Sequence, residues 1–319
     1  MTFLNRFLLC FILISVNVFS QKTQEAYFKV VPLGTKGGID EKNLSAYLLA
    51  PLNTNDYISL DAGTIHSGIE KAIENKVFKV STNTVLRKFI KGYLISHAHL
   101  DHVSGMIINS AADSSKTVYA TNKCMEMMQK HYFNDETWVN FGDRGRGKPL
   151  NMYHFQTLAI DEEIAINNTS MTVKAFPLSH GNPFESTAFL IKNADNYILY
   201  LGDTGPDIVE KSNDLRSLWA IVAPLIKTKQ LKGMFIEVSF PNEQLDQFLY
   251  GHLTPNHLMK ELHVLEELAG KDSLKGFKII ITHLKPPVNN IAKIKAQLKK
   301  QNDLGLKIIY PEQGKRFNL

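Results

Sequence analysis

The stretch Tyr93-Leu-Ile-Ser-His-Ala-His-Leu-Asp-His102 constrains this chain more than any other. It begins with an apolar, β-prone run, which predicts a buried strand. Four side chains that can bind metal follow directly: His97, His99, Asp101 and His102. Three imidazoles and a carboxylate this close together make a poor core and a poor surface strand, but they suit a borderline divalent cation such as zinc. The stretch therefore predicts a metal site at the end of a strand.

The spacing also predicts how these side chains are presented. Alternate residues of an extended backbone share a face, so the first two histidines and Asp101 should point one way, with Ala98 and Leu100 pointing into the core. His102 breaks this alternation and can join the others only if the chain curls as it leaves the strand. Val103–Ile108 would then begin the following helix.

The composition is that of a globular protein, and the charge does not indicate a nucleic-acid partner. The chain has 319 residues, of which 44% are hydrophobic and 21% charged, as in ordinary globular proteins. The net charge of +5 is mild and there is no dense block of lysine and arginine, so charge does not indicate a nucleic-acid polymer as partner. We find no linker rich in proline, glycine or serine, which favours one catalytic domain over residues 21–319.

Residues 1–20 differ from the rest of the chain. Arg6 precedes the apolar run Phe7–Val16, and small or permissive residues follow before Gln21. This layout predicts a signal peptide, too short for a comfortable membrane span, although an uncleaved anchor stays open. We therefore expect an exported protein, periplasmic or secreted, without stable membrane association after cleavage. Only Cys124 would remain, so the mature chain has no intramolecular disulfide and relies on its core and its metals.

Three later strands also end in a side chain that can bind metal. They are Met171–Phe176 leading to His180, Asn196–Leu201 leading to Asp203, and Phe277–Ile281 leading to His283. If the four strands are neighbours, their loops meet along one edge, where functional loops on rigid scaffolds are usually found. Strands come first as hairpins and then alternate with helices, in two successive halves. This predicts an α+β fold: two mixed sheets face to face with helices on the outer faces, a four-layer αββα sandwich.

The order of these motifs resembles the metallo-β-lactamase superfamily, to which the His-x-His-x-Asp-His pattern belongs. The residues that make up each motif are similar to those of the class II 3′,5′-cyclic-nucleotide phosphodiesterases. The passages that carry this likeness are Ser96–Gly105, Phe235–Phe240 and Gly251–Pro255. It runs from about residue 27 to the C-terminus. The resemblance implies the metallo-β-lactamase-type fold and hydrolysis of a small cyclic nucleotide, cyclic AMP with or without cyclic GMP.

The resemblance also implies two divalent metal ions, zinc being the first expectation. The implied ligands are His97, His99 and His180 for one ion, Asp101, His102 and His283 for the other, and Asp203 between them. Asp101 counts as a catalytic residue as well. A hydroxide shared by the two ions would attack phosphorus in line and open the ring to a nucleoside 5′-monophosphate.

A cyclic phosphodiester further requires that the departing 3′ oxygen be protonated. His252 is the candidate general acid, with Glu237 holding its other ring nitrogen. The alternative is that Glu237 pairs with a lysine and His252 only lines the rim. Asp61 either braces the metal loop or is an ordinary turn residue. The lone histidines His66, His257 and His263 are expected to be exposed.

Other functions remain open. A tRNA 3′-processing endonuclease of the same superfamily also pairs a glutamate with a distant histidine, but it carries a long basic arm, and the turn 142–148 is too short for one. Thioester or lactone hydrolysis and a non-catalytic metal scaffold rank lower. Residues 131–138 are aromatic and could form a flap over a base, or a surface excursion. The preferred base, the native metal and the oligomeric state are not predicted.

Overall fold

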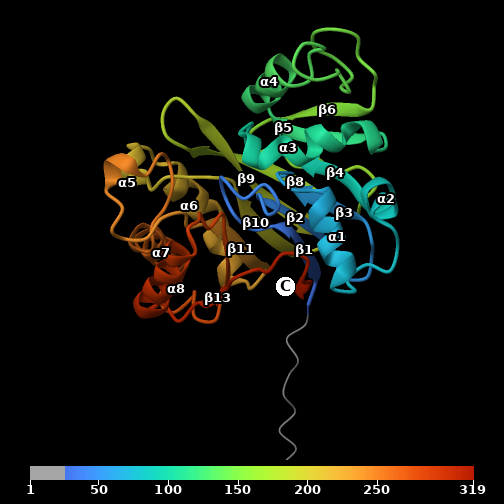
Figure 1. Ribbon diagram of the computed structural model, residues 1–319. Coiled ribbons are helices and arrows are strands. Elements are labelled where there is room, and N and C mark those ends of the chain that lie inside the picture. The colour runs from blue at the N-terminus through green and yellow to red at the C-terminus, as the bar shows by residue number, and fades with distance from the viewer. Residues whose placement is uncertain (1–25) are drawn as a thin grey trace, which may run out of the picture.

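The computed structural model describes residues 26–319, and the predicted signal peptide lies outside the described residues. Two seven-stranded sheets pack face to face. Helices α1 to α4 belong to the half drawn in blue to green in Figure 1, and α5 to α8 to the half drawn in yellow to red. This is the predicted four-layer αββα sandwich of the α+β class.

The first sheet has the strand order β14-β1-β2-β3-β4-β5-β6. Its pairs are antiparallel from β14 to β3 and parallel from β3 to β6. The strands are β1 (Phe28–Gly34), β2 (Ala46–Pro51), β3 (Tyr57–Leu60), β4 (Ile90–Leu94), β5 (Lys116–Thr121), β6 (Tyr153–Leu158) and β14 (Phe317–Asn318).

The second sheet repeats this plan with the order β13-β12-β11-β10-β9-β8-β7. Its pairs are parallel from β13 to β10 and antiparallel from β10 to β7. The strands are β7 (Ile164–Ala165), β8 (Thr172–Ser179), β9 (Glu185–Asn193), β10 (Asn196–Leu201), β11 (Leu231–Glu237), β12 (Lys278–Thr282) and β13 (Lys307–Ile309).

Helices cover the outer faces of both sheets, and all except the short helices α2 and α5 bury residues on one side. The first half carries α1 (His66–Glu74), α2 (Thr82–Thr84), α3 (Leu100–Asn109) and α4 (Asn122–His131); the second carries α5 (Asp207–Glu210), α6 (Asp214–Lys227), α7 (Pro255–Ala269) and α8 (Val288–Gln301). Three buried clusters result: one under each helical layer and one between the sheets, where Tyr47, Tyr200 and Phe235 meet. None of the helices in residues 26–319 has both the length and the apolar character needed to cross a bilayer.

The predicted strand ends do meet at one edge, but the strands are not neighbours. Strand β4 belongs to the first sheet, and β9 and β11 separate β8, β10 and β12 in the second. Strands β8 and β10 are both antiparallel to β9, so they run in the same direction, and β10, β11 and β12 are parallel. Strands β8, β10 and β12 therefore end on the same side of the second sheet. Convergence was predicted on the condition that the four strands are neighbours; this condition is not met, yet the loops converge.

Two local expectations also need correction. Helix α3 begins at Leu100 rather than near Val103, and Leu100 is 61% exposed instead of lying in the core. The chain leaves its extended course one residue after His99, so the alternation of faces ends there. This early turn is what brings His102 round toward the preceding histidines. Helix α6, which carries buried Leu215, Trp219 and other apolar residues, was not predicted.

One of the three outlying histidines was also misjudged. His66 and His263 are exposed as expected, and each faces an acidic side chain at the surface. His257 is only 7% exposed, because its ring lies against the first turn of α7. There its Nδ1 and the Oγ1 of Thr254, the N-cap residue of α7, are 2.9 Å apart. It is a capping partner rather than a solvated side chain.

Candidate metal-binding active site

The structure brings together all seven side chains predicted as metal ligands. Their ligand atoms form two groups, and within each group they lie within 4.8 Å of one another. The first group is His97, His99 and His180, and the second is Asp101, His102, Asp203 and His283. They come from the loop after β4, the first turn of α3 and the loops after β8, β10 and β12. Residues up to 186 positions apart in the chain, from His97 to His283, thus line one small volume.

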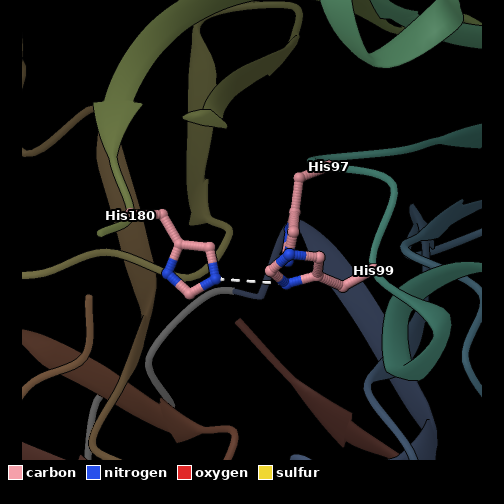
Figure 2. Close-up of side chains that lie close together, drawn as sticks. All are labelled: His97, His99 and His180. Atoms are coloured by element: carbon pink, nitrogen blue, oxygen red, sulfur yellow. Dashed lines mark hydrogen bonds between the residues drawn. The ribbon is translucent and has the colours of Figure 1, made fainter. Parts of the chain in front are cut away.

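The three histidines of the first group converge from two halves of the molecule. Figure 2 shows the imidazoles of His97 and His99 approaching that of His180 from the opposite side. The Nε2 atom of His180 lies 3.3 Å from the Nδ1 atom of His99. The ring centroids of His97 and His99 are 4.5 Å apart, and those of His97 and His180 are 4.9 Å apart. A single cation placed among these nitrogens could be bound by all three.

Asp203 lies between the two groups. Its Oδ2 atom is 3.2 Å from the Nε2 atom of His283 and 3.3 Å from that of His102. The same oxygen is 3.8 Å from the Nε2 atom of His180 and 3.9 Å from that of His97. One carboxylate therefore faces imidazoles of both groups, which is the arrangement expected of a shared ligand.

Hydrogen bonds behind the histidines hold their rings in this orientation. The Nδ1 atom of His102 lies 2.7 Å from the Oδ2 atom of Asp61. The Nδ1 atom of His180 lies 2.8 Å from the carbonyl oxygen of Gly251, and that of His283 lies 2.9 Å from the Oγ atom of Ser239. Each contact leaves Nε2 facing the centre, as is usual for metal-ligating histidines.

Asp61, which closely follows β3, is the bracing residue and not an ordinary turn aspartate. It is fully buried, and its carboxylate also accepts hydrogen bonds from the backbone and hydroxyl of Ser96 and from the hydroxyl of Tyr200. Tyr200 belongs to the second sheet, so Asp61 ties the metal loop of the first sheet to the second. Neither Tyr200 nor Ser239 was predicted, because their roles depend on packing between the sheets.

The protonation states of the site suit a cation. Burial and the neighbouring imidazoles lower the pKa of His97 and His99, and burial lowers that of His180 to about 4, so these rings are neutral at pH 7. Burial opposes ionisation of Asp101 and Asp203, but the surrounding imidazoles outweigh it and hold the pKa of both carboxyls below the usual range. Neutral imidazoles and ionised carboxylates are the forms that bind divalent metals. His102 differs, because the neighbouring carboxylates, Asp203 first, outweigh burial and raise its pKa well above the usual range, so this ring must lose a proton when a metal binds.

Two buried nitrogens show directly that these residues fit a metal. The Nε2 atoms of His97 and His102 are buried and have no hydrogen-bond partner within residues 26–319, although burying an unpaired polar atom is costly. Both nitrogens face Asp203. A cation among them would satisfy both at once. The donor set is therefore that of a divalent-metal site.

Metal removal should destabilise the fold. We expect a chelator to lower the thermal unfolding midpoint by about 5 °C or more, because a ligand that binds only the native state at 1,000 times its dissociation constant contributes about 4 kcal/mol. Calorimetry with and without chelator measures this, and restoring Zn²⁺ should reverse the shift. Identical midpoints for the metal-loaded and chelated protein would contradict the assignment of a divalent-metal site.

Glu237 and His252 form the predicted pair beside the metal ligands. Glu237 ends β11, between the strands that lead to Asp203 and His283, and its Oε1 atom lies 2.6 Å from the Nδ1 atom of His252. Both side chains are buried. Burial lowers the pKa of His252 to about 3, and burial together with Asp203 raises that of Glu237 to about 7. Separated charges are disfavoured here, so one proton is held between the two groups.

The comparisons with known proteins identify the family. Residues 26–314 match the family model of the class-II cAMP phosphodiesterases. The chain belongs to this family. It is 43% identical to a 3′,5′-cyclic-nucleotide phosphodiesterase of Aliivibrio fischeri, over 94% of this chain and 95% of that protein. It is 39% identical to a probable 3′,5′-cyclic-nucleotide phosphodiesterase of Yersinia pestis, over 95% of this chain and 92% of that protein.

A solved structure supports the fold. The crystal structure of unliganded yeast PDE1 superposes with a TM-score of 0.82 and covers 92% of this chain and 100% of that one, at 23% sequence identity. Membership of the phosphodiesterase family confirms the predicted enzyme class and reaction: the protein is a 3′,5′-cyclic-nucleotide phosphodiesterase. The family assignment therefore disfavours the alternatives of tRNA processing, thioester or lactone hydrolysis and a non-catalytic scaffold.

This phosphodiesterase also has a lysine in its site that was not predicted. The Nζ atom of Lys285 lies 2.8 Å from the Nε2 atom of His252, on the side of the ring opposite Glu237. The expected alternative had a lysine pairing with Glu237, whereas this lysine contacts the histidine. Lys285 follows His283 by two residues, and that short spacing from a predicted ligand was the available signal.

The aromatic segment 131–138 contributes more to packing than to a flap. Phe133 is fully buried in the core of the first half. The Nε1 atom of Trp138 donates a hydrogen bond to the Oγ atom of Ser110, and the hydroxyl of Tyr132 donates one to the carbonyl of Ala98. The basic turn 142–148 lies at the surface, as expected. These contacts favour the reading of this region as a surface excursion.

Proposed function

We propose that this phosphodiesterase uses two divalent cations, zinc in the first instance, to hydrolyse 3′,5′-cyclic nucleotides, and that it acts after export to the periplasm or medium. His97, His99 and His180 would hold one cation, and Asp101, His102 and His283 the other, with Asp203 shared. The observation that carries the proposal is the position of the Asp203 Oδ2 atom between both groups of nitrogens. The export proposal rests on the layout of residues 1–20.

When bound, a pair of divalent cations supplies an acidified water as nucleophile and positive charge for the phosphate oxygens. The residues of the chain must then supply a proton to the departing 3′ oxygen. Hydrolysis forms a bond from the water oxygen to phosphorus and breaks the bond from phosphorus to the 3′ oxygen. The water loses a proton, and the departing 3′ oxygen gains one. A general acid near the leaving oxygen is therefore required.

His252 is placed for that proton transfer, with help on both sides of its ring. Its Nδ1 faces Glu237 and its Nε2 faces Lys285. The pKa of His252 is lowered to about 3, mainly by burial, so the imidazole is neutral at rest and Nε2 accepts the hydrogen bond from the lysine ammonium. We infer that Lys285 transfers a proton to Nε2, which forms the imidazolium, and that this Nε2 proton then passes to the 3′ oxygen and leaves Lys285 neutral. Glu237 fixes the ring and stabilises the imidazolium that forms in between.

The decisive experiment compares substrates with one preparation of metal-loaded protein. Purified protein is incubated separately with cyclic AMP, cyclic GMP and a precursor tRNA, and the products are separated. We expect nucleoside 5′-monophosphates from the cyclic nucleotides and an intact tRNA. Cleavage of the RNA alone would overturn the proposal. N-terminal sequencing of the protein recovered outside the cytoplasm tests export, with a mature end at Gln21 expected.

Replacing Lys285 tests the proposed proton supply. Lys285→Met should lower kcat for cyclic AMP by about 10- to 100-fold, because a hydrogen bond from a charged group is lost. Lys285→Arg keeps the charge and should retain more of the activity. Metal content, measured in parallel, should stay at the wild-type level in both variants. Equal kcat for the wild type and Lys285→Met would exclude a role for this lysine.

A further inference from the structure

A cavity of about 200 Å³ opens beside the first group of histidines. His97 and His99 form one wall. Helix α4 forms another through Cys124 and Met127, and the turn between β8 and β9 closes the third through Pro183 and Phe184. The cavity is thus continuous with the proposed metal site, and the mechanism above leaves it unused.

The walls of this cavity are mostly apolar and include an exposed aromatic ring. Phe184 is 46% exposed, so a large part of its ring is free to contact a ligand in the cavity. Its ring centroid lies 5.0 Å from that of His99, with the planes at 70°. Phe184 therefore stands at the border between the metal site and the cavity. A flat, apolar ligand would bury it.

The rim of the cavity carries one donor and one acceptor that are held in place. The Nζ atom of Lys123 lies 2.7 Å from the Oε1 atom of Glu185 and 3.1 Å from the carbonyl oxygen of Pro183. This ion pair joins α4 of the first half to the start of β9 in the second. Both side chains remain about half exposed and keep free hydrogen-bonding positions. The rim therefore offers a cation and a carboxylate side by side.

We propose that this cavity binds the nucleobase of the substrate, with Phe184 against the ring and the pair Lys123–Glu185 on its polar edge. The proposal rests on the proposed function, since a phosphate held at the metal site places the rest of a cyclic nucleotide nearby. A base has apolar faces and an edge of donors and acceptors, which matches an apolar cavity with one charged rim. Glu185 and Lys123 then determine which base is preferred.

The chemistry of the rim favours guanine. A carboxylate can accept two parallel hydrogen bonds, and guanine presents two adjacent N–H donors, at N1 and N2, for that purpose. Adenine presents a donor next to an acceptor, which an amide side chain satisfies better than a carboxylate does. Glu185→Gln should therefore lower kcat/KM for cyclic GMP more than for cyclic AMP, changing their ratio by at least about fivefold. Glu267→Gln, an exposed change on α7, is the matched control.

Phe184 is tested with a pair of substrates that differ only in the base. Phe184→Ala should raise KM for cyclic GMP and cyclic AMP by about tenfold, the usual value of one stacking contact. The comparison substrate is methyl ribofuranoside 3′,5′-cyclic phosphate, which has the same cyclic ester without a base. The ratio of kcat/KM between the nucleotides and this analogue should fall about tenfold. An equal loss on all substrates would mean that Phe184 only supports His99, and would overturn the proposal.

Equilibrium binding separates this proposal from the proposed function. Isothermal titration of the wild type should show guanosine 5′-monophosphate binding at least about tenfold more tightly than ribose 5-phosphate, with the difference reduced in Phe184→Ala. If the wild type hydrolyses neither cyclic nucleotide, the proposed function is wrong. The titration still tests whether the cavity binds a base, because it does not depend on turnover. Equal affinity for both ligands would overturn the base site.

Discussion

Asp203→Asn should reduce kcat/KM for cyclic AMP by at least about 10³-fold and should lower the metal content of the purified protein. The substitution keeps the size of the side chain and removes its negative charge. Divalent cations stabilise a phosphoryl transition state by several kcal/mol, and each 1.4 kcal/mol corresponds to a factor of ten. The Oδ2 atom of Asp203 faces imidazoles of both ligand groups, so weakening this one residue affects both.

Metal analysis by mass spectrometry and steady-state kinetics measure the two effects together. The matched control is Asp161→Asn, because Asp161 is a surface aspartate whose side chain pairs, among residues 26–319, with Lys174 alone. That variant should keep its metals and its rate. If Asp203→Asn retained both its metal content and wild-type turnover, Asp203 could not be a ligand shared by the two groups.

His252→Ala should lower kcat for cyclic AMP by at least about 10²-fold while the metal content stays at the wild-type level. The magnitude is that of a lost general acid. The effect should be smaller with bis-4-nitrophenyl phosphate, because nitrophenolate is a stable anion and leaves without a proton. This difference between the two substrates distinguishes proton donation from a general disturbance of the site.

The design of the His252 experiment must allow for the buried glutamate beside it. Removing the histidine leaves Glu237 buried without its partner, and breaking a buried pair in this way can destabilise the fold. His252→Gln, which retains a hydrogen bond to Glu237, is therefore measured alongside, and thermal unfolding is recorded for both. His263→Ala, an exposed histidine of α7, is the control. Wild-type kcat in a folded His252→Gln variant would remove His252 from the mechanism.

Local patterns predicted most of the elements that form the site. The strands that lead to His97, His180, Asp203 and His283 were predicted because their apolar periodicity is a local property. The start of α3 was misplaced, since the turn after His99 depends on how the loop packs and not on its own alternation. Helix α6 was missed although its apolar spacing is readable in the sequence.

The residues around the ligands could not be found in this way. Asp61 follows β3 of the first sheet and Tyr200 lies in β10 of the second, yet their side chains meet behind His102. Lys285 contacts His252 from a loop 33 positions further on. The cavity beside His99 exists only because α4 and the turn before β9 face one another. Apart from the short spacing between His283 and Lys285, no spacing in the chain would reveal these contacts.

By itself, the sequence determined the ligand types, their positions at strand ends and the family, because ligand chemistry and strand periodicity depend on residues that are close together in the chain. Only the tertiary structure decided that one oxygen of Asp203 faces both groups, that Lys285 contacts the Nε2 atom of His252, and that an apolar cavity borders the first group. The physical reason is that hydrogen bonds and cavities depend on distances of a few ångströms between segments on different sheets. Those distances are set by packing of the two sheets and their helices.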